Sequence, residues 1–243
     1  TDIAIFSGNK SDYTITETAY AQYQVVDNRG YPSSVSDIAT SFTAANISIS
    51  DGSVQTVFIG DIDNDDDLDI ISSGYNDKIT WHENDGAVNP SFTSAIVSSG
   101  IGNTFTVFAA DIDKDGDLDI LSGSNTNLIL HENDGAANPS WTKSTIGSTS
   151  KFITNIYVVD VDGDGDLDVI SGHYTNSSNP HDVFIWHEND GATNPTFSSN
   201  NISSSGLYGN QALFAADIDG DSDIDIIGGS EGKITFFESN GAT

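Results

Sequence analysis

An all-β fold built from repeated four-stranded units is predicted by three features of this 243-residue sequence. A nine-residue acidic run recurs four times, and short apolar segments flank each copy. No segment keeps the 3.6-residue apolar period of an amphipathic helix, so we expect almost no helix. Repeats of this kind decide the architecture of the whole chain.

The acidic runs are followed by a second motif at a nearly constant distance. The runs begin 50, 49 and 57 residues apart, at Asp61, Asp111, Asp160 and Asp217. The second motif reads WHENDGAVNPSF, LHENDGAANPSW, WHENDGATNPTF and, in the last unit, FFESNGAT. The third unit is longer because it holds an insertion over residues His173–Asp182.

Four short strands are expected in each unit, and the unit that begins at residue 54 shows the pattern. Its apolar segments are rich in Val, Ile, Phe and Thr and are bounded by Gly, Asn, Asp or Pro, as strands and hairpin turns are. They cover Val54–Ile59, Leu68–Ser72, Lys78–Glu83 and Phe92–Ser98. Repeated four-stranded antiparallel units of this size are typical of the blades of a β-propeller.

We therefore predict one β-propeller domain over residues 1–243, with about five repeat units. Full blades are expected at residues 54–101, 104–148 and 152–204. Residues 1–50 form a divergent partial blade in this interpretation, and residues 211–243 form a second incomplete blade. Exposed strand edges invite pairing with another chain, so incomplete blades predict a protein partner or self-assembly.

The composition excludes several classes of partner. Asp and Glu number 37 against 7 Lys and Arg, which gives a formal net charge of −30. Nucleic acids and anionic membrane surfaces attract basic proteins, so neither is an expected partner. The chain has no Cys, which excludes disulfides and Cys-based zinc sites, and it lacks an apolar stretch long enough for a membrane helix. We expect a secreted, extracellular or cell-surface protein.

The acidic runs are predicted to bind metal ions. Each places Asp at its first, third, fifth, seventh and ninth positions, a density of like charge that repels itself unless a cation gathers the carboxylates. Calcium prefers six to eight oxygen ligands with flexible geometry, whereas magnesium needs a tight octahedron and transition metals favour imidazole or thiolate. About four Ca²⁺ ions are expected. The predicted metal residues are Asp61, Asp63, Asp65, Asp67, Asp69, Asp111, Asp113, Asp115, Asp117, Asp119, Asp160, Asp162, Asp164, Asp166, Asp168, Asp217, Asp219, Asp221, Asp223 and Asp225.

The sixth position of each run needs a small residue, or one that tolerates a left-handed backbone, so that the chain can fold back on the ion. It is occupied by Asp66, Gly116, Gly165 and Ser222. By analogy with short calcium loops, positions one, three, five and nine should supply carboxylates and position seven its carbonyl.

The pattern DxDxDGDxD followed by an apolar strand resembles the FG-GAP or VCBS repeats of integrin-like β-propellers. The resemblance covers Val54–Thr243 in four units and extends more weakly over residues 2–50. It implies calcium bound between the first and second strands of each blade. Asp66 and Ser222 depart from the usual Gly, and the first unit has lost its loop. Residues 9–30 are also similar to segments that flank repeats in secreted RTX proteins.

Catalysis is not expected. His82 and Glu83 begin an apparent HExxH metalloprotease motif, but Gly86 stands where its second His should be. A pair of carboxylates could serve glycoside hydrolysis, yet 21 acidic residues already belong to the four predicted metal loops. One position of the second motif is apolar in every unit, as a packing position would be: Trp81, Leu130, Trp186 and Phe236. The next position is His82, His131 and His187 in the first three of these units and Phe237 in the last, which also favours packing.

The predicted function is that of a calcium-stabilised extracellular module in adhesion or in a surface assembly or filament. The alternatives are a carbohydrate-binding, lectin-like module and a non-catalytic domain appended to a secreted hydrolase. Insertions in repeat arrays often bind ligands, which makes His173, Tyr174 and His181 candidate ligand-binding residues and a glycan a candidate partner. Candidate glycosylation sequons lie at Asn9, Asn46, Asn176 and Asn201.

Overall fold

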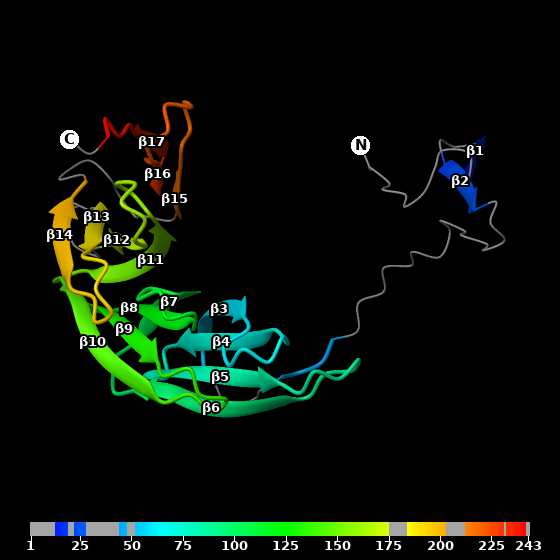
Figure 1. Cartoon of the computed structure of the whole chain (residues 1–243), viewed down its shortest axis with the longest axis horizontal. Coiled ribbons are helices and arrows are strands. Elements are labelled where there is room, and N and C mark those ends of the chain that lie inside the picture. The colour runs from blue at the N-terminus through cyan, green and yellow to red at the C-terminus, as the bar shows by residue number, and fades with distance from the viewer. Residues whose placement is uncertain are drawn as a thin grey trace. The chain divides into compact units, whose positions relative to one another are not determined.

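The computed structural model describes residues 13–18, 22–27, 44–47, 52–174, 184–202, 212–230 and 232–241. The chain divides into two compact units, Thr1–Asn46 and Ile47–Thr243. In the smaller unit, β1 (Tyr13–Thr18) pairs antiparallel with β2 (Gln22–Asp27) (Figure 1). Most of the partial blade expected over residues 1–50 lies outside the described residues, so that expectation stays a prediction.

In its described residues, the larger unit contains four antiparallel sheets in which each strand pairs with the next along the chain. The first holds β3 (Val54–Gly60), β4 (Asp69–Gly74), β5 (Lys78–Asn84) and β6 (Phe92–Ser99). The second holds β7 (Thr104–Ala110), β8 (Asp119–Ser124), β9 (Asn127–Asn133) and β10 (Trp141–Ser148). The third holds β11 (Phe152–Val159), β12 (Asp168–Tyr174), β13 (Phe184–Asn189) and β14 (Phe197–Asn201). The last holds β15 (Ala212–Ala216), β16 (Asp225–Ser230) and β17 (Lys233–Phe237).

The prediction of an all-β fold with four-stranded units is confirmed. The described residues contain strands and turns but no helix. Accordingly, no helix in this part of the chain is long and apolar enough to cross a membrane. Alternating Val, Ile, Phe and Thr residues pack well on a pleated surface, and the NDG turns between the third and fourth strands supply the positive φ angles that tight turns need.

Consecutive sheets pack face to face, with their first strands β3, β7, β11 and β15 next to one another (Figure 1). We call the face of a sheet that packs on the following sheet its rear face and the opposite face its front face. Between the first two sheets, Ile71 and Ile79 of the rear face meet Val107 and Ile120 of the front face. Equivalent apolar clusters fill the next two junctions. Each junction is thus a small hydrophobic core that neither sheet could form alone.

Histidines on the third strands are buried and hydrogen-bonded within their sheets. In the first sheet, His82 lies between the hydroxyls of Ser72, at 2.9 Å from Nε2, and Ser94, at 2.8 Å from Nδ1. In the third sheet, His187 makes the same contacts with Ser171 and Ser199. The last sheet has Phe237 in this place. These contacts give the histidine column a structural role.

The second sheet breaks this pattern. His131 Nε2 lies 2.9 Å from Ser122 Oγ, but its Nδ1 is buried without a hydrogen-bond partner. The residue opposite His131 on the fourth strand is Lys143, where the first and third sheets have Ser94 and Ser199. Burial, with a smaller contribution from the Lys143 charge, lowers the pKa of His131 from 6.5 to about 4.

Acid should destabilise the fold through this buried ring. Because the folded chain holds the pKa of His131 below its unfolded value, protonation favours the unfolded chain. Stability present above pH 6.5 is therefore lost as the pH falls toward 4. Replacing the ring in His131→Phe should reduce the drop in unfolding free energy between pH 7 and pH 4.5 by on the order of 2 to 3 kcal/mol, measured by urea denaturation.

Lys143→Ala is the matched control for this prediction. It removes the nearby charge but leaves the ring buried, and burial is the larger cause of the lowered pKa. This variant should keep most of the pH dependence. If the unfolding free energies of the wild type and His131→Phe depended on pH in the same way, the acid sensitivity could not come from His131.

Candidate metal centres

Each acidic run forms the loop between the first and second strands of its sheet. The chain adopts a left-handed backbone at the sixth position of all four loops, with φ between 73° and 98°. This confirms the expectation for Asp66, Gly116, Gly165 and Ser222. The fourth position is left-handed as well, with φ from 59° at Asn64 to 84° at Gly220. Two left-handed residues in each loop let nine residues coil tightly.

The carboxylates themselves hold the coil in shape. At the first position, Asp61 Oδ2 accepts a hydrogen bond from the amide of Asp66 at 3.0 Å. The equivalent bonds in the other loops measure 3.1, 2.9 and 3.2 Å. At the fifth position, Oδ1 accepts the amide of the seventh residue at 2.8 to 3.0 Å in all four loops. These bonds fix the carboxylates in place before any ligand binds.

Carboxylate oxygens lie close to one another in each loop. Ligand atoms of positions one, three and five lie within 4.8 Å of one another in the first three loops: Asp61, Asp63 and Asp65; Asp111, Asp113 and Asp115; Asp160, Asp162 and Asp164. In the fourth loop the group is Asp217, Asp219 and Asp225, which are positions one, three and nine. Asp63 Oδ1 and Asp111 Oδ1 are buried without hydrogen-bond partners. A hard cation would satisfy such oxygens.

The third position shows the electrostatic cost of this convergence. Burial, followed by the Asp65 charge, raises the pKa of Asp63 to about 6. The pKa values of Asp113, Asp162 and Asp219 are raised as well, and burial is the first cause each time, with the fifth-position charge adding to it. Their shared environment penalises the charged form, and a bound cation would reverse that penalty.

The ninth-position carboxylate is buried beneath the loop and joins three backbone segments. Asp69 accepts hydrogen bonds from the Ile62 amide at 3.3 Å, the Trp81 indole at 2.9 Å and the Asn84 amide at 2.8 Å. Asp119, Asp168 and Asp225 repeat the two amide bonds. Burial raises the pKa of Asp119 to about 7. In every loop, both oxygens of the ninth-position Asp thus accept hydrogen bonds from backbone amides.

The seventh-position side chain packs against the glycine of the NDG turn. A Cβ on Gly86 would lie 2.0 Å from Asp67 Oδ2, and one on Gly135 would lie 2.1 Å from Asp117 Oδ2. These glycines also have φ near 65°. The turn Asn holds the same glycine, because Asn133 Oδ1 accepts the Gly135 amide at 3.1 Å. The second sequence motif is thus part of the loop's support.

The Asp of each NDG turn stabilises the turn and does not join the metal cluster. Asp85 Oδ1 accepts the amides of Ala87 at 3.2 Å and Ser91 at 3.0 Å. Asp134 and Asp190 make the equivalent bonds. The amide bonds, led by those from Ser91 and Ser140, lower the pKa values of Asp85 and Asp134. The pKa of Asp190 is lowered first by the hydroxyl of Thr196 and then by the amide bonds.

Loops of adjacent sheets are linked to each other. At the fourth position, Asn64 donates to Asp117 of the next loop, and Lys114 forms an ion pair with Asp166 of the loop after it. Asn133 Nδ2 also donates to Ile62 O at 3.0 Å, and Asn189 Nδ2 to Ile112 O at 3.1 Å. We did not anticipate these residues from the sequence. Only the co-occurrence of the two motifs in every unit signalled their joint role.

The other candidate residues are described only in part. His173 was expected in an exposed insertion, but it lies on β12, is buried, and contacts Ser171 Oγ at 2.7 Å. Tyr174 stacks with Phe152 at a ring separation of 6.4 Å. His181, Asn9 and Asn176 lie outside the described residues. The sequon residues Asn46 and Asn201 are exposed.

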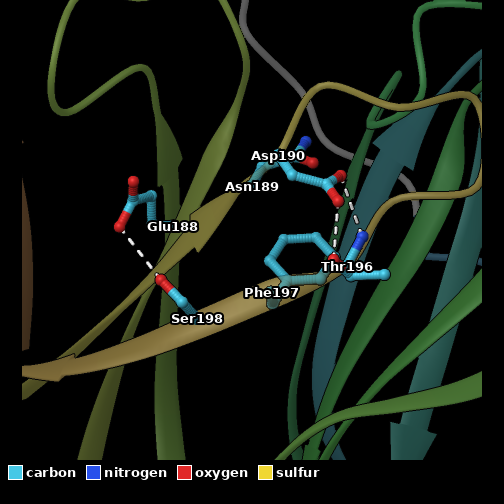
Figure 2. Close-up of a pocket in the computed structure, with 6 residues that line it drawn as sticks. All are labelled: Glu188, Asn189, Asp190, Thr196, Phe197 and Ser198. Carbon is cyan, nitrogen blue, oxygen red and sulfur yellow. Dashed lines mark hydrogen bonds between the residues drawn. The ribbon is translucent and has the colours of Figure 1, made fainter.

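A shallow hollow of about 150 Å³ lies at the turn between β13 and β14 (Figure 2). It is lined by Glu188, Asn189, Asp190, Thr196, Phe197 and Ser198. Its carboxylates are engaged within the turn: Asp190 accepts from the amide and hydroxyl of Thr196, and Glu188 accepts from Ser198 Oγ at 3.0 Å. The hollow therefore shows no free acid–base pair.

Fold and loops together define a β-propeller-like repeat protein with four acidic loops. Residues 61–122 and 111–171 match the model of the FG-GAP-like repeat. No curated protein matches the chain. A lectin from Agrocybe aegerita, described as specifically recognising non-reducing terminal N-acetylglucosamine, is similar in structure, with a TM-score of 0.51 and 20% identity. The match covers 76% of this chain and 50% of the lectin chain, so this likeness shows the fold alone.

Relieving the backbone strain at Ser222 should stabilise the fourth loop. Its φ of 80° disfavours a residue with a Cβ, and two of the other loops have Gly here. Ser222→Gly should raise the unfolding free energy by about 1 kcal/mol, measured by urea denaturation. Ser222→Ala, which keeps the Cβ, is the control and should bring no gain. A lower stability for Ser222→Gly would contradict this account.

Proposed function

We propose that this chain is a calcium-stabilised, non-catalytic building block of an extracellular or cell-surface assembly, acting in adhesion or as a structural subunit. The observation that carries the proposal is the geometry of the third-position carboxylates. They converge with their neighbours in four loops, and burial and like charge raise their pKa values. The FG-GAP-like repeats and the high acidic content support an extracellular setting.

Calcium suits these loops better than other common ions. The donors are carboxylate and backbone oxygens, and the described loops offer neither imidazole nor thiolate. The loops also differ in the precise set of converging carboxylates, which suits an ion of flexible coordination. Bound calcium would neutralise each cluster and hold the first strand to the second, so its binding free energy would add to the stability of the fold.

Removing one carboxylate of a cluster should remove one calcium site. Asp63→Asn eliminates the charge at the third position of the first loop, so the calcium stoichiometry from calorimetry should fall from about four to about three. Excess chelator should lower the melting temperature of the wild type sharply, because apo loops repel themselves.

Asp66→Asn is the matched control. It removes one negative charge from the same loop, and Asn tolerates the left-handed backbone, but Asp66 is not part of the converging group. This variant should keep the wild-type stoichiometry. A melting temperature that chelator leaves unchanged in the wild type would contradict the calcium proposal.

Neutral-glycan binding is the second candidate function, and a row of aromatic rings favours it. Tyr75, Phe105, Phe152 and Tyr174 follow one another across three sheets with ring separations of 5.6, 5.4 and 6.4 Å. They lie at the strand ends opposite the acidic loops, and Tyr75 is half exposed. Aromatic rings stack on the apolar faces of sugars, and the structural likeness to a lectin adds support.

A glycan array should test this second function with the calcium-loaded chain. If the row binds sugar, a selective hit should appear, and Tyr75→Ala should weaken its affinity on the order of tenfold by losing one stacking face. Phe92→Ala, at the acidic-loop end of the same sheet, is the control and should bind normally. Absence of any selective hit would exclude the glycan function and leave the structural one.

A further inference from the structure

The fourth-position side chain of an acidic loop can reach the next loop, and its chemistry changes along the chain. In the first loop, Asn64 Nδ2 donates a hydrogen bond to Asp117 Oδ1 of the second loop at 2.5 Å. In the second loop, Lys114 Nζ forms an ion pair with Asp166 Oδ1 of the third loop. The third loop has Gly163 at this position, which has no side chain to reach the fourth loop. The second loop thus receives a neutral amide from its neighbour, whereas the third loop receives a charged ammonium.

Asn64 and Lys114 deliver these groups from the same backbone conformation. Their φ angles are 59° and 63°, both in the left-handed region. Each side chain contacts the seventh-position carboxylate of the following loop. The two links are therefore equivalent in geometry and differ in the charge that they bring to the next loop.

The Lys114 charge acts on the carboxylate cluster of the third loop. The amide of its partner Asp166 donates to Asp164 Oδ1 at 2.8 Å, and Asp164 belongs to that cluster. The bond with Asp166 raises the pKa of Lys114, and the charges of Asp166, Asp164 and Asp160 add to the rise. An ammonium that is attracted by these carboxylates repels a cation that binds to them.

The second and third loops are otherwise closely matched. Both have Asp at positions one, three, five, seven and nine and Gly at position six. In both, ligand atoms of the first three of these Asp residues lie within 4.8 Å of one another. Lys114 is itself part of the second loop, but its ammonium pairs with the third. The incoming charge is therefore the main difference between the two clusters.

We propose that Lys114 sets the calcium affinity of the third loop. Its ammonium partly neutralises that loop and weakens calcium binding there, whereas Asn64 makes the same link to the second loop without a charge. As the free calcium concentration falls, the third loop therefore releases its ion before the second, and the third sheet loses this stabilisation first. This regulation rests on the calcium-stabilised role proposed above.

Exchanging the two side chains tests the charge while keeping the links. Lys114→Asn should still bond Asp166, as Asn64 bonds Asp117, and should raise the calcium affinity of one site about fivefold in calorimetry. Asn64→Lys should lower the affinity of one site by a similar factor. The calcium stoichiometry should stay at the wild-type value in both variants. Both effects should shrink in about 1 M salt, which screens the added or removed charge.

Deleting one site at a time assigns each change to a loop. Asp162→Asn removes the third-position carboxylate of the third loop, and in this background Lys114→Asn should leave the remaining affinities unchanged. Asp113→Asn removes the equivalent carboxylate of the second loop, and in this background Asn64→Lys should have no effect.

Lys143→Ala is the matched control, because it removes the same charge from β10, outside the loops. It should bind calcium with the wild-type affinities. Unchanged affinities in Lys114→Asn, or a gain that persists in the Asp162→Asn background, would overturn the role of Lys114 alone. A wild type that binds no calcium in calorimetry, and whose melting temperature chelator leaves unchanged, would overturn the calcium proposal and this inference with it.

Discussion

The buried carboxylate at the ninth position of each acidic loop ties together three segments of backbone. In the first sheet, Asp69 starts β4 and accepts hydrogen bonds from the loop amide of Ile62 and from Asn84 at the end of β5. A buried carboxylate stays charged only if donors or a cation compensate its lost hydration. The raised pKa of Asp119 shows that two amides compensate it only in part. The metal cluster above it and the turn beside it complete this compensation in our interpretation.

This constraint explains why the acidic run and the turn motif occur together in each repeat unit. The acidic run supplies the carboxylates, and the turn supplies the amide that reaches the ninth position and the glycine that leaves room for the seventh. Neither motif forms a stable structure by itself, because the run repels itself and a turn needs strands to join. Four calcium ions would also change the formal net charge from −30 to −22, and this reduction would take place at the four loops.

The sequence predicts the strands well because each one is short, apolar and bounded by turn residues. The predicted strand Lys78–Glu83 is observed as Lys78–Asn84, and the left-handed sixth position follows from Gly116 and Gly165. The sequence does not reveal contacts between units. The bonds of Asn64 and Asn133 join residues more than fifty positions apart, and no local pattern marks them. His173 was misplaced for a similar reason, since β12 continues into the segment that alignment of the repeats marks as inserted.

Among the residues that the structure describes, the junction between the third and last sheets lacks both polar links found at the earlier junctions. The fourth position of the third loop is Gly163, which has no side chain to reach the next loop, and Ser239 replaces the turn Asn and is too short for the second bond. The last sheet therefore rests on apolar contacts such as that between Phe184 and Phe237. Local opening should begin here, and native-state hydrogen exchange would find the amides of β15–β17 the least protected of the four sheets.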